Sequence, residues 1–78
     1  MNESKIEELA NILQSANIVE FFHKGFYYEV FLSADSGYIV NIYSSDDKDD
    51  EGEFVEANLV DGGLCSSKKA RDAIEFML

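Results

Sequence analysis

The feature that most constrains the fold is the stretch from residue 18 to residue 44, where two short turns separate three β-prone runs. The runs are rich in aromatic and β-branched residues, which are typical of strands. They are residues 18–23, 26–33 and 38–44. Lys24-Gly25 fits a tight turn, and Asp35-Ser36-Gly37 fits a three-residue hairpin loop with Gly37 at the left-handed position. Strands joined by such short turns pair antiparallel, so the stretch predicts a β-meander.

Helical patterns flank this meander on both sides. Ser4 and Glu7 have the spacing of a capping box, and the helix that they begin is expected to end at Ser15-Ala16-Asn17. Ser66 or Ser67 is expected to cap a second helix near the C-terminus. Both helices have an apolar face with helical periodicity. The apolar residues are Ile6, Leu9, Ala10 and Leu13 in the first helix, and Ala70, Ala73, Ile74 and Met77 in the second.

Residues 53–60 are predicted to form a fourth strand, and Asp61-Gly62-Gly63 a turn. The order is then α-β-β-β-β-α. We predict a single α+β domain over residues 1–78, with an antiparallel three- to four-stranded meander sheet and an N-terminal and a C-terminal helix. The turns should pair Val19 with Val30, Phe21 with Tyr28, Leu32 with Val40 and Val30 with Ile42. These residues share one face, which both helices could cover.

The opposite face of the predicted sheet is unusually aromatic. Its residues are Phe22, Tyr27, Glu29, Phe31, Ile39, Asn41, Tyr43, Phe54 and Glu56. Two interpretations stay open. This face could be covered, either because the helices divide between the two faces or because flanking segments lie on it, or it could contact a partner or a second copy of the chain. The candidate residues for a partner-binding or dimer surface are Tyr27, Phe31, Ile39, Tyr43 and Phe54.

The charge of the chain restricts its partners. Sixteen acids against six bases give a formal net charge of −10. Nucleic acids and anionic membranes are poor partners for such a chain, because both are bound through Lys and Arg. A basic protein surface is an attractive partner, although acidity can also serve solubility alone. The N-terminus lacks the pattern of a signal peptide and no apolar run could span a bilayer, which predicts a cytoplasmic location.

Much of the acidity lies between residues 46 and 61, which contain eight acids and one lysine. If this segment is extended, Glu51 and Glu53 would lie about 6.7 Å apart, close to the phosphate repeat of a stretched nucleic-acid strand. The segment could therefore mimic nucleic-acid charge in the basic groove of a nucleic-acid-binding protein. In composition alone the chain is similar to phage-encoded anti-restriction and anti-CRISPR proteins. The candidate residues are Asp46, Asp47, Asp49, Asp50, Glu51, Glu53 and Glu56.

The same segment partly matches the sequence pattern of an EF-hand calcium loop. Asp47, Asp49 and Glu51 fall at positions 1, 3 and 5 of an EF-hand pattern, with Gly52 at position 6. Position 12 is Asn58, where a bidentate glutamate is required. The segment therefore predicts weak divalent binding at most, and no cofactor or metal site is assigned.

No catalytic site is predicted. His23 and Cys65 are the sole histidine and cysteine, and they would be the only nucleophile–base pair of that kind. We expect a non-enzymatic protein-binding module, an inhibitor if it occupies the groove of its partner. The alternatives are a structural or regulatory homodimer, whose acidity serves solubility, and a weak calcium-binding module.

Overall fold

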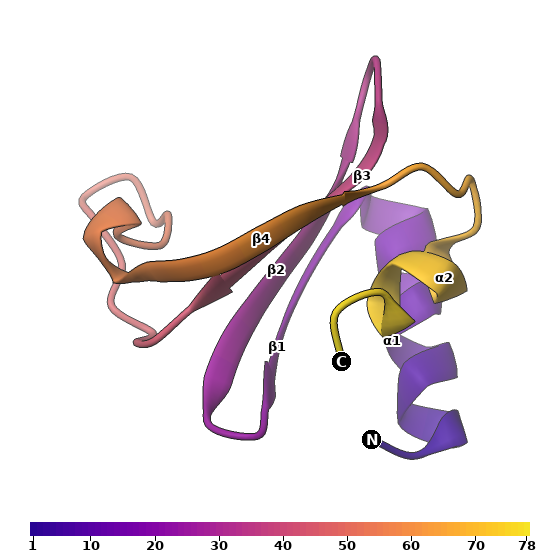
Figure 1. The fold of residues 1–78 in the computed structure, drawn as a ribbon, viewed down its shortest axis with the longest axis horizontal. Coiled ribbons are helices and arrows are strands. Elements are labelled where there is room, and N and C mark those ends of the chain that lie inside the picture. The colour runs from indigo at the N-terminus through magenta and orange to yellow at the C-terminus, as the bar shows by residue number, and fades with distance from the viewer.

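Four antiparallel strands form one meander sheet with the order β1-β2-β3-β4, and a helix lies at each end of the chain (Figure 1). This computed structural model describes all 78 residues. The predicted α+β architecture is confirmed. The elements are α1 (Glu3–Ala16), β1 (Ile18–His23), β2 (Phe26–Ser33), β3 (Gly37–Tyr43), the 3-10 turn η1 (Glu56–Asn58), β4 (Leu59–Cys65) and α2 (Ala70–Glu75).

Both helices pack on the same face of the sheet, so they do not divide between its two faces (Figure 1). Helix α1 contacts β1, α2 contacts β3, and the two helices contact each other. One cluster of 15 buried residues joins these elements. The largest side chains that are almost wholly buried are Leu13, Val30, Val40 and Ile74. Two of them come from the helices and two from the central strands β2 and β3, so the helix–sheet contact is the core of the protein.

Helix α1 begins two residues before the predicted cap. Asn2 has extended backbone angles, and its side-chain oxygen accepts a hydrogen bond from the Lys5 amide at 2.8 Å. Ser4 lies inside the first turn, so the predicted Ser4–Glu7 capping box is wrong. The predicted C-terminal end is confirmed, because Asn17 adopts the left-handed conformation at a φ of 65° and donates its amide proton to the Leu13 carbonyl. This is the usual αL termination of a helix.

The first hairpin has the expected register, with Val19 opposite Val30 and Phe21 opposite Tyr28. The second hairpin is shifted by two residues, so that Val40 lies opposite Val30 instead of Leu32. The shift arises because Ser33 pairs with Gly37, which leaves residues 34–36 as the loop. A shift of two keeps each side chain on its expected face, because the side-chain period of a strand is two.

The fourth strand lies later than predicted. Strand β4 is Leu59–Cys65, so only the last two residues of the predicted strand 53–60 belong to it, and Asp61-Gly62-Gly63 is not a turn. The physical reason is packing at Gly63, where an added Cβ would lie 2.8 Å from Cε2 of Phe76 and 3.1 Å from Sδ of Met77. The glycine therefore allows the end of the chain to pack closely on the strand, and it does not mark a reversal.

The cap of α2 also differs from the prediction. Lys69 occupies the N-cap position, and neither Ser66 nor Ser67 does. Ser67 stabilises the approach to the helix instead. Its hydroxyl oxygen accepts the Lys69 amide proton at 3.1 Å, and the hydroxyl donates to Asp72 Oδ2 at 2.6 Å.

The structure makes Gly37 the glycine that is least replaceable. Its φ is +96°, and an added Cβ would lie 2.6 Å from the backbone oxygen of Cys65 on β4. We expect Gly37→Ala to destabilise the fold by about 1–3 kcal/mol more than Gly25→Ala, because overpacking adds to the shared cost of a positive φ. Gly25 is a matched control, since its φ is +89° and nothing lies within 4 Å of the added Cβ. Urea unfolding of both variants measures the difference, and equal losses would contradict the assigned contact.

Candidate partner-binding face

Residues 46–56, called the acidic hairpin below, fold back on themselves between β3 and β4. Lys48 and Phe54 form an isolated antiparallel bridge. Two backbone hydrogen bonds flank the bridge, from the Asp49 amide to the Glu53 carbonyl at 2.8 Å and from the Val55 amide to the Asp47 carbonyl at 3.3 Å. The segment therefore has a defined conformation of its own and is not an open connection.

The tip of the acidic hairpin is organised by Asp49. Its Oδ1 accepts hydrogen bonds from the backbone amides of Glu51, at 2.9 Å, and Glu53, at 3.0 Å. The Gly52 amide donates to the Asp49 carbonyl at 3.0 Å, and Gly52 has a φ of +79°. The chain turns here, so Glu51 and Glu53 are not on an extended strand. The extended conformation on which the phosphate-like spacing of these two carboxylates depended is therefore absent.

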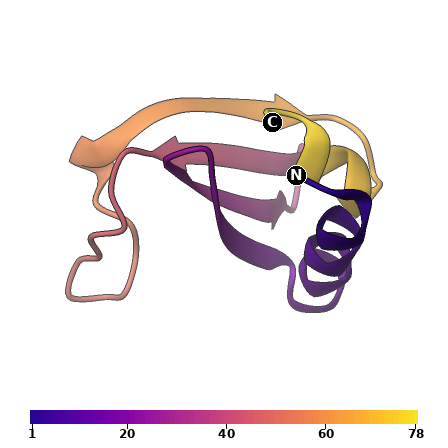
Figure 2. The same ribbon diagram turned by 90° about the horizontal axis from the view of Figure 1, so that it is seen from below.

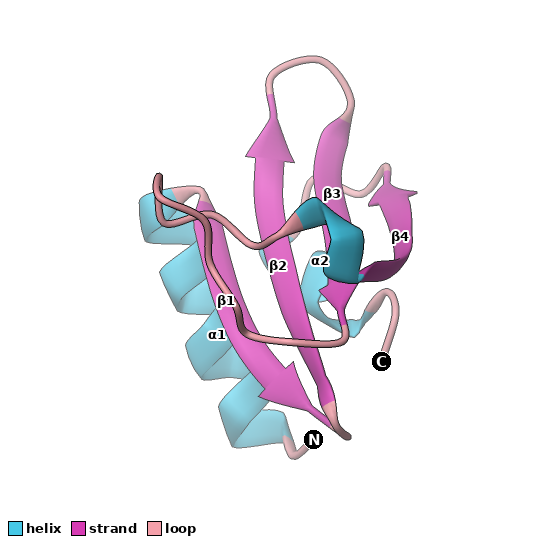
Figure 3. Cartoon of the chain, turned by 90° about the vertical axis from the view of Figure 1, so that its left-hand side faces the viewer, coloured by secondary structure: helices cyan, strands magenta, loops and turns pink.

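The acidic hairpin is docked on the sheet face opposite the helices, where it crosses in front of β1 and β2 (Figure 3). The ring of Phe54 stacks on Tyr43 with 4.5 Å between centroids and 14° between planes. Both rings are buried, yet neither belongs to the core cluster on the helix side. Lys48 completes the contact, with its Nζ 4.0 Å from the Phe54 centroid and 2.8 Å from Glu20 Oε1. Part of the second face is thus covered by a flanking segment, one of the two outcomes expected for it.

The strand register arranges the second face in three rows across the sheet. One row is apolar, the middle row is polar, and the third is aromatic and lies under the acidic hairpin. The apolar row is Ile18, Phe31, Ile39 and Leu64; the polar row is Glu20, Glu29, Asn41 and Gly62; the aromatic row is Phe22, Tyr27, Tyr43 and Leu59. Directly opposite side chains in such rows contact each other, so the face combines apolar and acidic groups.

Like charges meet in the middle row, because Glu20 lies directly opposite Glu29. Such a pair is destabilising unless other groups compensate it. Lys48 contacts Glu20, while Asn41 Nδ2 donates to Glu29 Oε1 at 3.3 Å and the Tyr43 hydroxyl donates to the same oxygen at 3.5 Å. Burial, and then the charge of Glu29, raise the pKa of Tyr43 above its ordinary value. The phenol therefore keeps its proton and remains a donor.

The acidic candidates are displayed outward. Asp46, Asp47, Asp49, Asp50, Glu51, Glu53 and Glu56 are all exposed, and none of them forms an ion pair within the chain. The aromatic candidates divide into two groups. Tyr43 and Phe54 are buried against each other, whereas Tyr27, Phe31 and Ile39 are half-buried. Tyr43 and Phe54 therefore support the surface from beneath, and the other three form part of it.

Several residues of this face escaped the sequence analysis. Ile18 and Glu20 alternate with Val19 and Phe21, so the period of two could have placed them beside Phe22 on the second face. Phe22 is the most exposed large apolar side chain, at 59%. Leu64 could not have been found, because its row depends on the position of β4. Two hollows of about 310 and about 370 Å³ flank Phe54, one toward Phe31 and one toward Phe22.

The residues considered for a nucleophile–base pair or a calcium loop do not assemble into a site. His23 pairs with Phe26 at one end of β1, whereas Cys65 pairs with Tyr38 at the opposite end of the sheet. Of the calcium-pattern residues, Asp49 binds amides of its own turn, and Asn58 lies in η1. No three His, Cys, Asp or Glu side chains gather where they could hold a metal ion.

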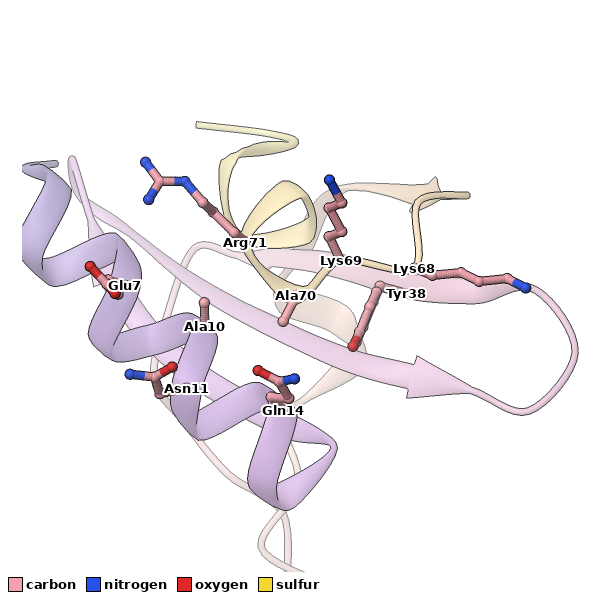
Figure 4. A pocket seen from close by; sticks show the side chains of 9 residues that line it. All are labelled: Glu7, Ala10, Asn11, Gln14, Tyr38, Lys68, Lys69, Ala70 and Arg71. Atoms are coloured by element: carbon pink, nitrogen blue, oxygen red, sulfur yellow. The ribbon is translucent and has the colours of Figure 1, made fainter.

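A further hollow of about 350 Å³ lies between α1 and α2, next to half of the basic residues of the chain (Figure 4). Lys68 and Arg71 extend in opposite directions there, so the cations do not converge on one point. Arg71 is engaged by Glu3 and by Glu75.

No protein-family model, curated protein or solved structure matches the chain. The assignment of a functional surface therefore depends on the geometry described above. None of the helices is long and apolar enough to cross a membrane.

Docking of the acidic hairpin through Phe54 is testable by truncation of the ring. We expect Phe54→Ala to lower stability by about 3 kcal/mol, as for other buried aromatic residues, and to accelerate hydrogen exchange at the Asp49 and Val55 amides. Phe22→Ala is the control, since this exposed ring should contribute within about 0.5 kcal/mol. Denaturant unfolding and amide exchange measure both effects. Unchanged exchange in Phe54→Ala would show that the hairpin holds its shape without docking.

Proposed function

We propose that this protein is a non-enzymatic binding module that attaches to a basic protein surface through the acidic hairpin and the adjoining aromatic part of the sheet. The single observation that carries the proposal is the docked hairpin. Its Lys48 is directed inward to Glu20 and Phe54, and its carboxylates have no ion-pair partner in the chain. A fixed, uncompensated group of carboxylates attracts cations over a long range.

Preorganisation supports the same proposal. The bridge at Lys48–Phe54 and the amide bonds to Asp49 hold the backbone of the acidic hairpin before any partner arrives. Binding of a partner then costs less conformational entropy, because the acidic hairpin does not have to be ordered in the complex. This argument favours recognition of a defined basic surface over a purely solubilising role for the acidic residues.

Apolar groups beside the carboxylates suit arginine in particular. Phe22 is exposed, and its ring centroid lies 4.9 Å from that of Tyr27. A guanidinium group can stack on such rings while it also bonds to carboxylates. Arginine-lined grooves are common in nucleic-acid-binding proteins, and a module seated in such a groove would inhibit binding of the nucleic acid. The mimicry that we propose depends on charge and rigidity, and no longer on a phosphate-like spacing.

The structure refines the choice of a test variant. Asp49 holds the turn, so it is left intact, and the triple variant is Asp50→Asn, Glu51→Gln and Glu53→Gln. We expect this variant to associate several-fold more slowly with the partner and to show a flatter salt dependence, because charges at a rim act mainly on the association rate. Its stability should stay equal or rise, since repulsion within the hairpin falls.

The partner is first captured from host lysate at low salt, eluted at high salt and purified, and binding kinetics are then measured at two salt concentrations. The control carries the same loss of three charges on the rest of the molecule, through Glu7→Gln, Glu8→Gln and Asp35→Asn. Slower association of both variants to the same extent would indicate an effect of net charge alone. An unchanged rate for the hairpin variant would remove the acidic hairpin from the binding surface.

A further inference from the structure

Strand β4 is an edge of the sheet, and its outer side carries no other element (Figure 2). An exposed edge presents unpaired backbone amides and carbonyls to any strand that approaches it. Natural proteins protect such edges with lysines, prolines or covering loops. Between Leu59 and Cys65 the strand has no lysine and no proline, and Asp61 is its one charged residue.

Exposed apolar side chains gather along this edge. Eleven large apolar residues of the chain are exposed, and five of them lie on β4 or on the C-terminal segment that packs against it. They are Leu59, Val60, Leu64, Phe76 and Leu78. The Phe76 ring lies over Gly63 of the strand. The edge therefore combines free hydrogen-bonding groups with an apolar border, which is a combination that protein interfaces use.

The distribution of charge selects a second copy of the chain as the occupant. Two molecules of net charge −10 repel each other most where their acidic hairpins meet. Each hairpin is held against β1 by the Lys48–Glu20 ion pair and hangs away from β4 (Figure 2). Pairing through β4 would keep the two hairpins at opposite ends of a joined sheet, whereas pairing through the second face would bring them together.

The ends of β4 are also complementary in charge. Glu56 lies before the strand, and Lys68 and Lys69 follow it. In an antiparallel pair of identical strands, the beginning of one lies beside the end of the other. Glu56 of each copy would then lie near the lysines of the other copy.

The hydrogen-bond pattern fixes the register. The Gly62 amide donates to the side chain of Asp61, at 2.8 Å, so this amide faces the outer edge and not β3. Because ladder bonds alternate along an antiparallel strand, the backbone amide of Leu64 also faces the outer edge. A twofold axis perpendicular to the sheet keeps the helix faces together and places one residue of the strand opposite its own copy. We choose the register with Gly62 opposite Gly62 of the second copy, because its outward amide is free for the ladder and Asp61 is then not opposite Asp61. Asp61 is then opposite Gly63 of that copy, and no two carboxylates are directly paired.

We infer that β4 pairs antiparallel with β4 of a second copy about a twofold axis at Gly62, which makes one continuous eight-stranded sheet. The Gly62 carbonyl of the second copy replaces the Asp61 carboxylate as the acceptor of the Gly62 amide proton. Seven residues of strand make a small interface, so the dimer is of the weak, concentration-dependent class. Both acidic hairpins remain free in it, and the inference does not depend on the partner proposed above.

Analytical ultracentrifugation across a concentration series, with matched charge variants, tests the inference. We expect the wild type to dimerise and Leu64→Lys to be monomeric, since a lysine beside the seam protects an edge strand. Phe22→Lys introduces the same charge at an exposed apolar site on the opposite edge strand, and it should dimerise like the wild type. A strictly monomeric wild type at millimolar concentration would overturn the inference, as would a dimer that Phe22→Lys abolishes and Leu64→Lys does not.

Chemical synthesis provides a variant that changes no side chain. Ligation at Cys65 gives access to a chain with N-methylglycine at position 62, in which a methyl group replaces the outward amide proton. We expect this chain to keep the circular dichroism spectrum of the monomer and to lose the dimer. In the wild type, exchange of the Gly62 amide should slow as concentration rises. A dimer that survives N-methylation, or exchange at Gly62 that is independent of concentration in a dimerising sample, would overturn the pairing.

Discussion

The architecture depends on one constraint, which is that the sheet has apolar side chains on both faces while the two helices can cover only one of them. Leu13 and Ile74 from the helices and Val30 and Val40 from the sheet close the first face into a core with almost no exposed area. The second face has no helix, and it is covered only in part, by a stack of Phe54 on Tyr43 outside that core. The position of the acidic hairpin follows from this need.

The same constraint explains why an acidic segment is structurally ordered. A run of carboxylates would ordinarily be solvated and extended, because like charges repel. Here Phe54 supplies apolar contact, Lys48 compensates Glu20, and Asp49 binds the amides of the turn. These contacts involve few of the carboxylates, so the charge that makes the segment a candidate for binding stays exposed. Order and high charge density are thus achieved by different residues of one segment.

The acidic hairpin is also separated in space from the apolar edge at β4. The hairpin lies on the β1 side of the second face, beside the exposed Phe22, whereas five of the eleven exposed large apolar residues lie along β4 and the C-terminal segment. A small protein can then engage a basic partner through one region and an apolar neighbour through another. The proposed pairing at β4 would double the number of acidic hairpins in the particle without any contact between them.

The sequence by itself determined the elements whose pattern is local. The alternation in 18–23 and 26–33 and the turn at Lys24-Gly25 were sufficient for the register of the first hairpin, and the periodic apolar faces were sufficient to identify both helices. These features depend on neighbours along the chain, which sequence analysis reads directly. The predicted register of the second hairpin was wrong by two residues. Every side chain still lies on its predicted face, because the side-chain period of a strand is two.

Only the tertiary structure decided where β4 lies, what the acidic segment does and which aromatic residues are exposed. Asp61-Gly62-Gly63 has the local signature of a turn, yet Gly63 is required where Phe76 and Met77, more than ten residues later, pack on the strand. Glu51 and Glu53 read as an extended edge, yet the backbone turns on Asp49. In the first case the residue is required by packing against side chains that are distant in sequence. In the second case a side-chain hydrogen bond competes with the extended conformation of a strand. Leu64 joined the apolar row of the second face for the same reason, since its register is set by pairing with Ile39 and not by its own neighbours.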